Sequence, residues 1–494
     1  MTLKKNIIAN YISQIYVALV GVVMLPTYLS YMGAEAYGLV GFYAMLQVWF
    51  SLLDVGLSST FSRQVARFRG GALSGIELRQ LLHGFEAIFF IIAALIVIVT
   101  YSLSNNIALQ WLNVELLDEN EVVSAIQIMS FIIALRWCTS LYRSTISGCE
   151  RFVWLSGFNS FIATLRFVLV IPVFVFIGTS PTDFFIFQLA VATIELAVLF
   201  VMSYRLMPNV QRYQVWNFKP ILKVYKFSLT IAFTAAVWVV ATQVDKLILS
   251  NLIKLSEYGY FSIAVLVASV IVKLGAPISN AILPRMSRLE AEGDSDGVIR
   301  LYKQGTQLVT VVTSSVTLTL VMFAEELLLA WTGDKDLSQY AASILILYAV
   351  GNSLLVLAAF PYYLQYAKGN LKYHLIGNIW FVLVLIPLMI WAVNTFGAIG
   401  AGYCWLGVNI FFIAAWVPIV HSKIVPNLNR QWFLNDILKI VLTVIPVAWL
   451  ISILVPSTDS RMVQLLLVAI SGVVLFAVAV FASSTTRGFV RRWL

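Results

Sequence analysis

The chain has 494 residues, of which 61% are hydrophobic and only 11% are charged. Soluble domains carry about 25% charged residues and the mean hydropathy here is +0.91, so the composition excludes an ordinary soluble domain. The formal net charge of +9 fits basic cytoplasmic loops of a membrane protein better than a nucleic-acid partner.

The apolar runs predict an all-α, multi-pass membrane protein. Lys4 and Lys5 precede the first run, which exceeds a signal-peptide core and lacks a small-residue cleavage site, so we expect a retained helix. Further runs of about 18–25 residues recur to the end of the chain. The about fourteen predicted helices are 7–31, 37–60, 83–103, 122–142, 153–178, 183–205, 222–247, 257–279, 304–324, 338–361, 373–394, 397–420, 434–455 and 463–484.

The loops between these segments alternate in charge. By our count, about 25 of the 32 basic residues lie on the side of the N-terminus, whereas the opposite side has only Lys254, Lys335 and Arg461. This asymmetry predicts that both termini are cytoplasmic. The loops are short and carry no nucleotide-binding, metalloprotease or hydrolase motif. His83, His374 and His421 are far apart, so we expect no enzyme, metal site or cofactor.

The chain contains a weak internal repeat. A shift of 221 positions aligns Tyr37-Gly38 with Tyr258-Gly259, and Tyr142 with Tyr363. The repeat predicts two six-helix bundles, residues 1–212 and 213–430, related by a pseudo-twofold axis along the membrane normal. Residues 431–494 would add two helices and a cytoplasmic tail. We expect each Tyr-Gly pair to mark an outward hairpin, with glycine supplying backbone freedom and tyrosine lying at the membrane interface.

Four motifs carry a family resemblance. They are PTYLSYMGAEAYG (26–38), QVDKLILSNLIKLSEYGYFSIA (243–264), ILPRMSRL (282–289) and FGAIGAG (396–402). In this order they resemble the polysaccharide transporters of the MOP flippase superfamily, which act on O-antigen and exopolysaccharide repeat units for lipopolysaccharide and related polymers. The resemblance implies alternating access in the bacterial inner membrane. The implied substrate is an oligosaccharide linked to undecaprenol through pyrophosphate, moved from the inner to the outer leaflet.

Charges deep in predicted helices are the candidate binding residues. A charge at a helix centre costs about 2.5–3.5 kcal/mol on insertion scales and indicates a functional site. Guanidinium groups suit phosphate oxygens, so Arg166 and Arg136 are expected cavity cations, and Lys273 is a third candidate for its ammonium charge. An internal ion pair for Arg166, with Glu195 or Asp54, and snorkelling of Arg136 and Lys273 remain the alternatives.

Other charges are candidates for coupling and gating. Glu195, Asp54 and Glu86 could bind H⁺ or Na⁺, or form ion pairs. Near the predicted helix ends, Asp245 and Lys246 suggest an outer gate, and a second set suggests an inner gate or phosphate capture. The inner set is Arg63, Arg67, Arg285 and Arg288. For each of these, a helix-end or topology role is the simpler alternative.

The repeat also shows that deep charge is uneven. At the 221-residue offset Arg136 falls on Leu357 and Asp54 on Gly275, so the first bundle is expected to supply most of the anion contacts. The rival functions are a cation-coupled drug or metabolite antiporter of the same superfamily and a membrane sugar polymerase or ligase. The expected partners are the lipid-linked oligosaccharide, membrane lipids, a polysaccharide polymerase and a chain-length regulator, around a monomeric transport unit without nucleic acid.

Overall fold

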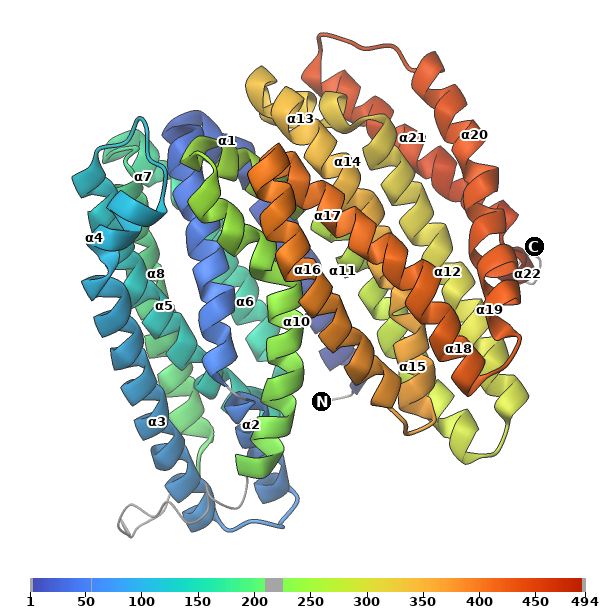
Figure 1. Cartoon of the computed structure of the whole chain (residues 1–494). Helices are drawn as coiled ribbons and strands as arrows, with labels where there is room; N and C mark the ends of the chain where they lie inside the picture. The colour runs from blue at the N-terminus through green and yellow to red at the C-terminus, as the bar shows by residue number, and fades with distance from the viewer. Residues whose placement is uncertain (1–2, 55, 209–224, 491–494) are drawn as a thin grey trace. The chain divides into compact units, whose positions relative to one another are not determined.

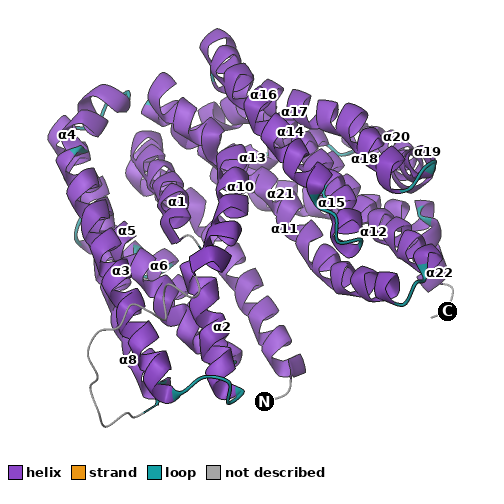
Figure 2. Cartoon of the chain, turned by 60° about the horizontal axis from the view of Figure 1, so that its bottom comes forward, coloured by secondary structure: helices purple, strands orange, loops and turns teal. Residues whose placement is uncertain are grey.

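The computed structural model describes residues 3–54, 56–208 and 225–490, and within this part the backbone is helical with short connections and no named strand (Figure 2). The chain divides into two compact units, Met1–Gly259 and Tyr260–Leu494. The predicted boundary at 212/213 lies outside the described residues. The same holds for five of the basic residues counted on the side of the N-terminus, which are Arg212, Lys219, Lys223, Arg491 and Arg492.

The first unit contains the amino-terminal helices. Their bounds are α1 Leu3–Ser51, η1 Leu52–Asp54, α2 Leu57–Arg69, α3 Gly75–Ser102, α4 Ser104–Asn106, η2 Ile107–Trp111, α5 Glu119–Gly148, α6 Phe152–Phe167, α7 Ile171–Phe176, α8 Pro181–Leu206 and α10 Tyr225–Leu252. The helix α11 (Leu255–Ala291) begins in this unit and continues into the second. Local sequence sets several helix starts, such as the capping box of Ser74 and Glu77 at α3 and the Ser180 cap before Pro181 at α8.

The second unit contains the remaining helices. Their bounds are α12 Ser295–Met322, α13 Ala324–Thr332, α14 Lys335–Ala358, α15 Phe360–Ala367, α16 Lys372–Phe396, α17 Ala398–Phe411, η3 Phe412–Trp416, α18 Val417–Ile424, α19 Leu428–Gln431, η4 Trp432–Leu438, α20 Lys439–Leu454, α21 Arg461–Ala482 and α22 Ser484–Val490. Apolar side chains of α12, α20 and α21 form one buried cluster there.

The predicted membrane-protein class is confirmed. Among the described residues, twelve helices are long and apolar enough to cross a membrane. The first of them, Ile8–Asp54, covers two of the predicted segments. The segment predicted at 222–247 corresponds to α10, although residues 222–224 lie outside the described part. The structure is thus consistent with about fourteen spans.

The helix α1 is a hairpin of two arms. It breaks at Gly33, whose φ of 80° and ψ of 170° are not helical and are readily adopted by glycine. The first arm runs parallel to α6. The Ser13 hydroxyl donates to the Ser156 carbonyl near the start of α6, and the Tyr28 hydroxyl donates to the Phe167 carbonyl at its end. The second arm leads into α2, which follows α5. Because α5 and α6 are joined by a tight turn, the two arms run in opposite directions (Figure 1).

The repeated Tyr-Gly pairs have a different role from the one expected. Gly38 and Gly259 are helical, and a Cβ on Gly38 would lie 2.2 Å from the carbonyl oxygen of Leu255. A Cβ on Gly259 would lie 2.5 Å from the Ala34 carbonyl oxygen and 3.1 Å from the Gly38 nitrogen. The two repeated glycines therefore allow close backbone contact between α1 and the start of α11. Their tyrosines are buried, with Tyr37 7% and Tyr258 0% exposed, so the interfacial placement expected for them was wrong.

Replacing Gly38 with Ala should destabilise the first unit. The added methyl group would meet backbone, which cannot rotate away, and overpacking of this kind typically costs about 1–3 kcal/mol. That exceeds the helix-propensity gain of about 0.5–1 kcal/mol. Thermal unfolding in detergent checks the result. The control is Gly157→Ala, because nothing lies within 4 Å of a Cβ there. Unfolding of the Gly38 variant at or above the wild-type temperature would contradict the close contact.

Candidate functional site

Two arginines in the first unit form the centre of the candidate site. Arg136 comes from α5 and Arg166 from the end of α6, and Gln188 of α8 connects them. The Arg136 Nη2 donates to Gln188 Oε1 at 3.3 Å, and Gln188 Nε2 donates to the Arg166 carbonyl at 2.9 Å. The Tyr28 hydroxyl also donates to backbone carbonyls at this point of α6. The amide of Gln188 therefore fixes the position of the Arg136 guanidinium relative to α6.

Aromatic rings support both guanidinium groups. The Arg136 Cζ lies 5.7 Å from the centre of the Tyr43 ring, on the second arm of α1. The Arg166 Cζ lies 5.3 Å from the ring of Phe167. Such contacts stabilise a cation by about 0.5–2 kcal/mol without neutralising it. Each of the two guanidinium groups thus has an aromatic ring as a neighbour.

Several donors of these arginines are unused. The Nε and Nη1 of Arg136 and the Nε of Arg166 are buried without a hydrogen-bond partner among the described residues. Leaving a buried donor unpaired costs about 1–3 kcal/mol, and more for a charged group. Guanidinium donors are well suited to oxygens of phosphate and carboxylate groups. The arrangement can therefore bind an anion that reaches both side chains.

The partner of Glu195 is Arg143, which the sequence prediction placed at a loop. Arg143 Nη2 donates to Glu195 Oε1 at 2.5 Å, and its Nη1 donates to Asn159 of α6. The Glu195 side chain is only 6% exposed, and its Oε2 has no hydrogen-bond partner among the described residues. The alternative in which Arg166 pairs with Glu195 or Asp54 is not seen among the ion pairs of the described residues. Glu195 is thus neutralised by Arg143, and the two central arginines remain in excess.

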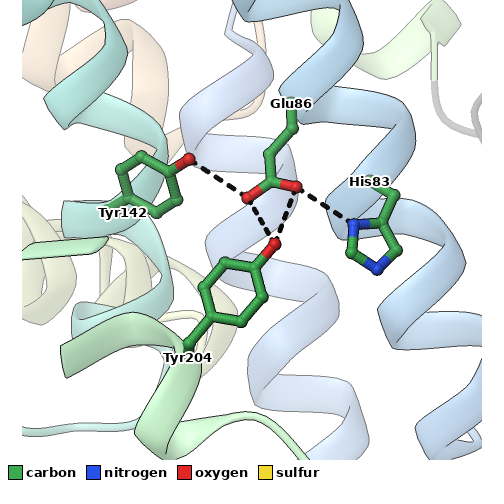
Figure 3. Close-up of polar contacts among 4 residues, drawn as sticks. All are labelled: His83, Glu86, Tyr142 and Tyr204. Atoms are coloured by element: carbon green, nitrogen blue, oxygen red, sulfur yellow. Dashed lines mark hydrogen bonds and ion pairs between the residues drawn. The ribbon is translucent and has the colours of Figure 1, made fainter. Parts of the chain in front are cut away.

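Glu86 lies in a separate polar cluster (Figure 3). Its Oε1 accepts hydrogen bonds from the hydroxyls of Tyr142, at 3.1 Å, and Tyr204, at 3.0 Å. Its Oε2 lies 3.0 Å from the Tyr204 hydroxyl and 3.1 Å from His83 Nδ1. The cluster joins α3, α5 and α8, and α5 packs against each of the other two helices in the first unit (Figure 1).

The remaining candidates lie at helix ends or on the surface. Asp54 Oδ1 accepts from the backbone nitrogen of Ser58, at 3.1 Å, and from its hydroxyl, at 2.9 Å, so it caps the start of α2. Lys273, on α11, is exposed. The four arginines of the suggested inner gate are also exposed, and two have local contacts, Arg67 with Gln64 and Arg288 with Glu292. The exposed members are Arg63, Arg67, Arg285 and Arg288.

The suggested outer gate residues have local partners. The Asp245 carboxylate accepts a hydrogen bond from the backbone nitrogen of Lys246 at 2.8 Å. The Lys246 ammonium donates a hydrogen bond to Gln243 Oε1 at 2.9 Å. A nearby exposed ion pair joins Lys254 to Glu115 at 2.8 Å. The hydrogen bond and the charge of Glu115 raise the pKa of Lys254.

A buried carboxylate organises the same corner of the first unit. The Glu35 carboxylate, on a residue that is 5% exposed, accepts three consecutive backbone nitrogens at 115–117. The Asn113 side chain donates to the carbonyls of Asn251 and Ile253. These bonds fix the loop before α5 against α1 and against the turn between α10 and α11. Two of its segments belong to the motifs at 26–38 and 243–264. The sequence did not place them together, because the three segments are far apart in the chain.

The second unit has its own buried polar contacts. The Tyr302 hydroxyl lies 2.7 Å from His421 Nε2, and Gln307 Nε2 donates a hydrogen bond to Asp436 Oδ1 at 2.7 Å. Leu357, which the repeat aligns with Arg136, is an apolar core residue with 3% exposure. Among the described residues, no group of three or more histidine, cysteine, aspartate or glutamate side chains could hold a metal ion.

Comparison with known proteins identifies the fold. The model of a family described as "Polysaccharide biosynthesis protein" matches residues 3–290. None of the curated proteins compared with the chain matches it. The chain is similar to the solved structure of the lipid II flippase MurJ in an inward closed conformation. That similarity has a TM-score of 0.72 at 17% identity and covers 95% of this chain and 97% of the other.

Two further solved structures are similar. One is an inward-facing multidrug resistance MATE family transporter of the MOP superfamily, with a TM-score of 0.69 at 13% identity, covering 84% of this chain and 96% of the other. Another is a MOP superfamily transporter from Pyrococcus furiosus, with a TM-score of 0.56 at 14% identity, covering 86% and 96%. At such identities the similarity shows the fold, which is that of the MOP superfamily transporters.

Proposed function

The chain belongs to the polysaccharide biosynthesis protein family, and we propose from this premise that it is a lipid-linked oligosaccharide flippase. Its substrate would be an O-antigen or exopolysaccharide repeat unit joined to undecaprenol through pyrophosphate. It would move this lipid by alternating access from the inner to the outer leaflet of the bacterial cytoplasmic membrane. Both termini would lie in the cytoplasm, and a monomer would be the transport unit.

The observation that carries this proposal is the pair of unneutralised arginines. Arg136 and Arg166 keep buried donors without partners, whereas the nearby Glu195 is already paired with Arg143. A pyrophosphate bridge is anionic on both phosphates and offers several acceptor oxygens, so one head group can satisfy donors on both side chains. Its binding would remove the cost of leaving these donors unpaired.

Polar side chains on the first arm of α1 support a sugar substrate. Asn10 and Gln14 are exposed in this membrane-length helix, and Gln14 Nε2 donates to Asn10 Oδ1 at 3.2 Å. Nearby, the exposed Tyr16 hydroxyl lies 2.7 Å from the Thr164 hydroxyl. Polar groups at membrane depth are tolerated where they face other protein or a water-filled cavity. Their donors and acceptors suit sugar hydroxyl groups.

The rival functions are less well supported. A cation-coupled antiporter of positively charged drugs or metabolites would have to hold its substrate near Arg136 and Arg166, where like charges repel. A sugar polymerase or ligase would need catalytic residues on a large outward loop, and the connections between the described helices on the predicted outer side are short. Coupling to an H⁺ or Na⁺ gradient, and association with a polymerase and a chain-length regulator, belong to the same proposal.

A binding measurement tests the substrate class. The purified chain in detergent should bind undecaprenyl pyrophosphate carrying an oligosaccharide, and native mass spectrometry should detect the complex. The comparison lipid is a polyprenol glycoside of the same length without phosphate, which should bind at least about tenfold more weakly because it offers no charge-assisted hydrogen bonds. Equal binding of the charged and neutral lipids would refute the assignment of a pyrophosphate site.

A further inference from the structure

The cluster around Glu86 shares no hydrogen bond with Arg136 or Arg166 among the described residues. Glu86 and His83 are one helical turn apart on α3, and the Glu86 residue is only 8% exposed. Two tyrosines from α5 and α8 complete the cluster (Figure 3). A buried carboxylate needs a reason beyond the linking of three helices, because burial of a charge is costly.

The contacts of Glu86 include one ionisable base, His83. Tyr142 and Tyr204 are neutral donors, and within the described part of the chain His83 is the only residue that forms an ion pair with Glu86. The His83 side chain is 35% exposed, so protons can reach the buried carboxylate through it. No lysine or arginine among the described residues forms an ion pair with Glu86.

The neighbouring ionisable groups have other contacts. Arg79 of α3 donates through Nε to the Pro208 carbonyl at 3.1 Å, and its Cζ lies 5.6 Å from the centre of the Tyr204 ring. Cys138 of α5 is buried one turn before Tyr142. The adjacent α2 carries three arginines, of which Arg67 bonds Gln64 and Arg69 bonds a backbone carbonyl. Those three are Arg63, Arg67 and Arg69.

The internal repeat supplies a natural comparison. The 221-residue shift places Glu86 on Gln307, and α12, which carries Gln307, has the same length as α3, 28 residues. Gln307 also connects separate elements, since it bonds Asp436 of η4 and the Ser483 hydroxyl before α22. A neutral amide is thus sufficient for connecting helices at this position of the repeat. The first unit instead has a titratable carboxylate next to a histidine.

We propose that His83 and Glu86 together bind one exchangeable proton, and that loading of this site is coupled to substrate movement. The coupling rests on the proposed flippase function, although the proton site itself does not. With the proton bound, the pair is either carboxylate with imidazolium or carboxyl with neutral imidazole, and no covalent bond other than that to the proton changes. Without it, the carboxylate faces a neutral ring that donates from Nδ1.

Proton loading changes how α8 is held. As a carboxylate, Glu86 accepts hydrogen bonds from the Tyr204 hydroxyl on both oxygens and from the Tyr142 hydroxyl on Oε1. A carboxyl group has fewer acceptor positions and gains a donor, so a proton on Oε2 removes one of the Tyr204 contacts. An imidazolium formed at His83 instead strengthens the link within α3 alone. The carboxyl form therefore changes the contacts between α3 and α8, and this change is the structural effect of the proton.

The first test needs no substrate. Infrared difference spectra of the full-length chain in lipid vesicles are recorded between about pH 5 and pH 8, the range in which histidine changes charge. We expect carboxyl or imidazolium signals that are lost in both Glu86→Gln and His83→Asn. Glu77→Gln, on the same helix, is the control that keeps them, because glutamine also serves a capping box. An unchanged difference spectrum in Glu86→Gln would overturn the proton site.

The second test addresses coupling. In vesicles with an imposed pH gradient, transfer of undecaprenyl-pyrophosphate oligosaccharide by the wild type should change at least severalfold with the gradient. The Glu86→Gln variant should transfer this lipid at the same rate with and without the pH gradient. Wild-type transfer that ignores the gradient would overturn the coupling but leave the flippase function intact. If the wild type transfers no lipid at all, the flippase function fails and the infrared result alone decides the proton site. Thermal unfolding of each variant verifies that it is folded.

Discussion

Replacing Arg166 with Ala should abolish export of the lipid-linked sugar while the protein still accumulates in the membrane. Arg166 has a buried Nε without a partner among the described residues, so its removal takes away a donor for the substrate and no internal ion pair. Loss of one partner of a buried, hydrogen-bonded charge pair costs about 2 kcal/mol or more, which is roughly a thirtyfold loss of affinity.

Surface glycan in a strain that depends on this chain measures the effect of Arg166→Ala. The matched control is Arg151→Ala, because Arg151 precedes the same helix α6 and is exposed. The control should export normally. Wild-type amounts of surface glycan from the Arg166 variant would contradict its role in binding the pyrophosphate. Immunoblotting of membranes shows whether both variants accumulate equally.

Replacing Glu195 with Gln should cause the largest loss of stability. The change leaves the Arg143 guanidinium without its carboxylate in a side chain that is only 29% exposed. Breaking a buried ion pair by removing one partner costs about 3–5 kcal/mol. Thermal unfolding in detergent, together with the yield of monodisperse protein, measures this loss.

The double variant Arg143→Leu with Glu195→Leu separates the contribution of this ion pair to stability from its contribution to export. Replacement of both partners by apolar residues is often neutral or stabilising, so most of the lost stability should return. If Glu195→Gln unfolds at the wild-type temperature, the pair does not hold α5 and α8 together. If the double variant is stable but inactive in export, the pair has a functional role as well.

The fold class was predictable because it depends on local composition. Apolar runs of membrane length locate the helices, and the small residues between them mark the breaks. The first hairpin was predicted between residues 31 and 37, and Gly33 lies there with a non-helical backbone. The role of Gly38 could not be predicted, because the reason for that glycine is the Leu255 carbonyl, which is more than 200 residues away.

The partners within the site were less predictable than its arginines. Arg136 and Arg166 stand out by their depth in apolar segments. Arg143 was assigned to a loop because the apolar run ends near Tyr142, whereas α5 continues to Gly148. An arginine within two turns of a predicted helix end should therefore be treated as a candidate for an internal ion pair. The tyrosines at Glu86 come from other helices, and no spacing in the sequence brings them together.

The most direct test of the central claim is leaflet transfer by the purified chain in sealed vesicles. Undecaprenyl-pyrophosphate oligosaccharide is placed in one leaflet, and its appearance in the other is followed with a membrane-impermeant glycosidase. We predict that the wild type makes the lipid accessible on the opposite side, and that the double variant Arg136→Ala with Arg166→Ala does not. Transfer no faster than in vesicles without protein, from a chain that is folded by its thermal unfolding, would contradict the proposed function.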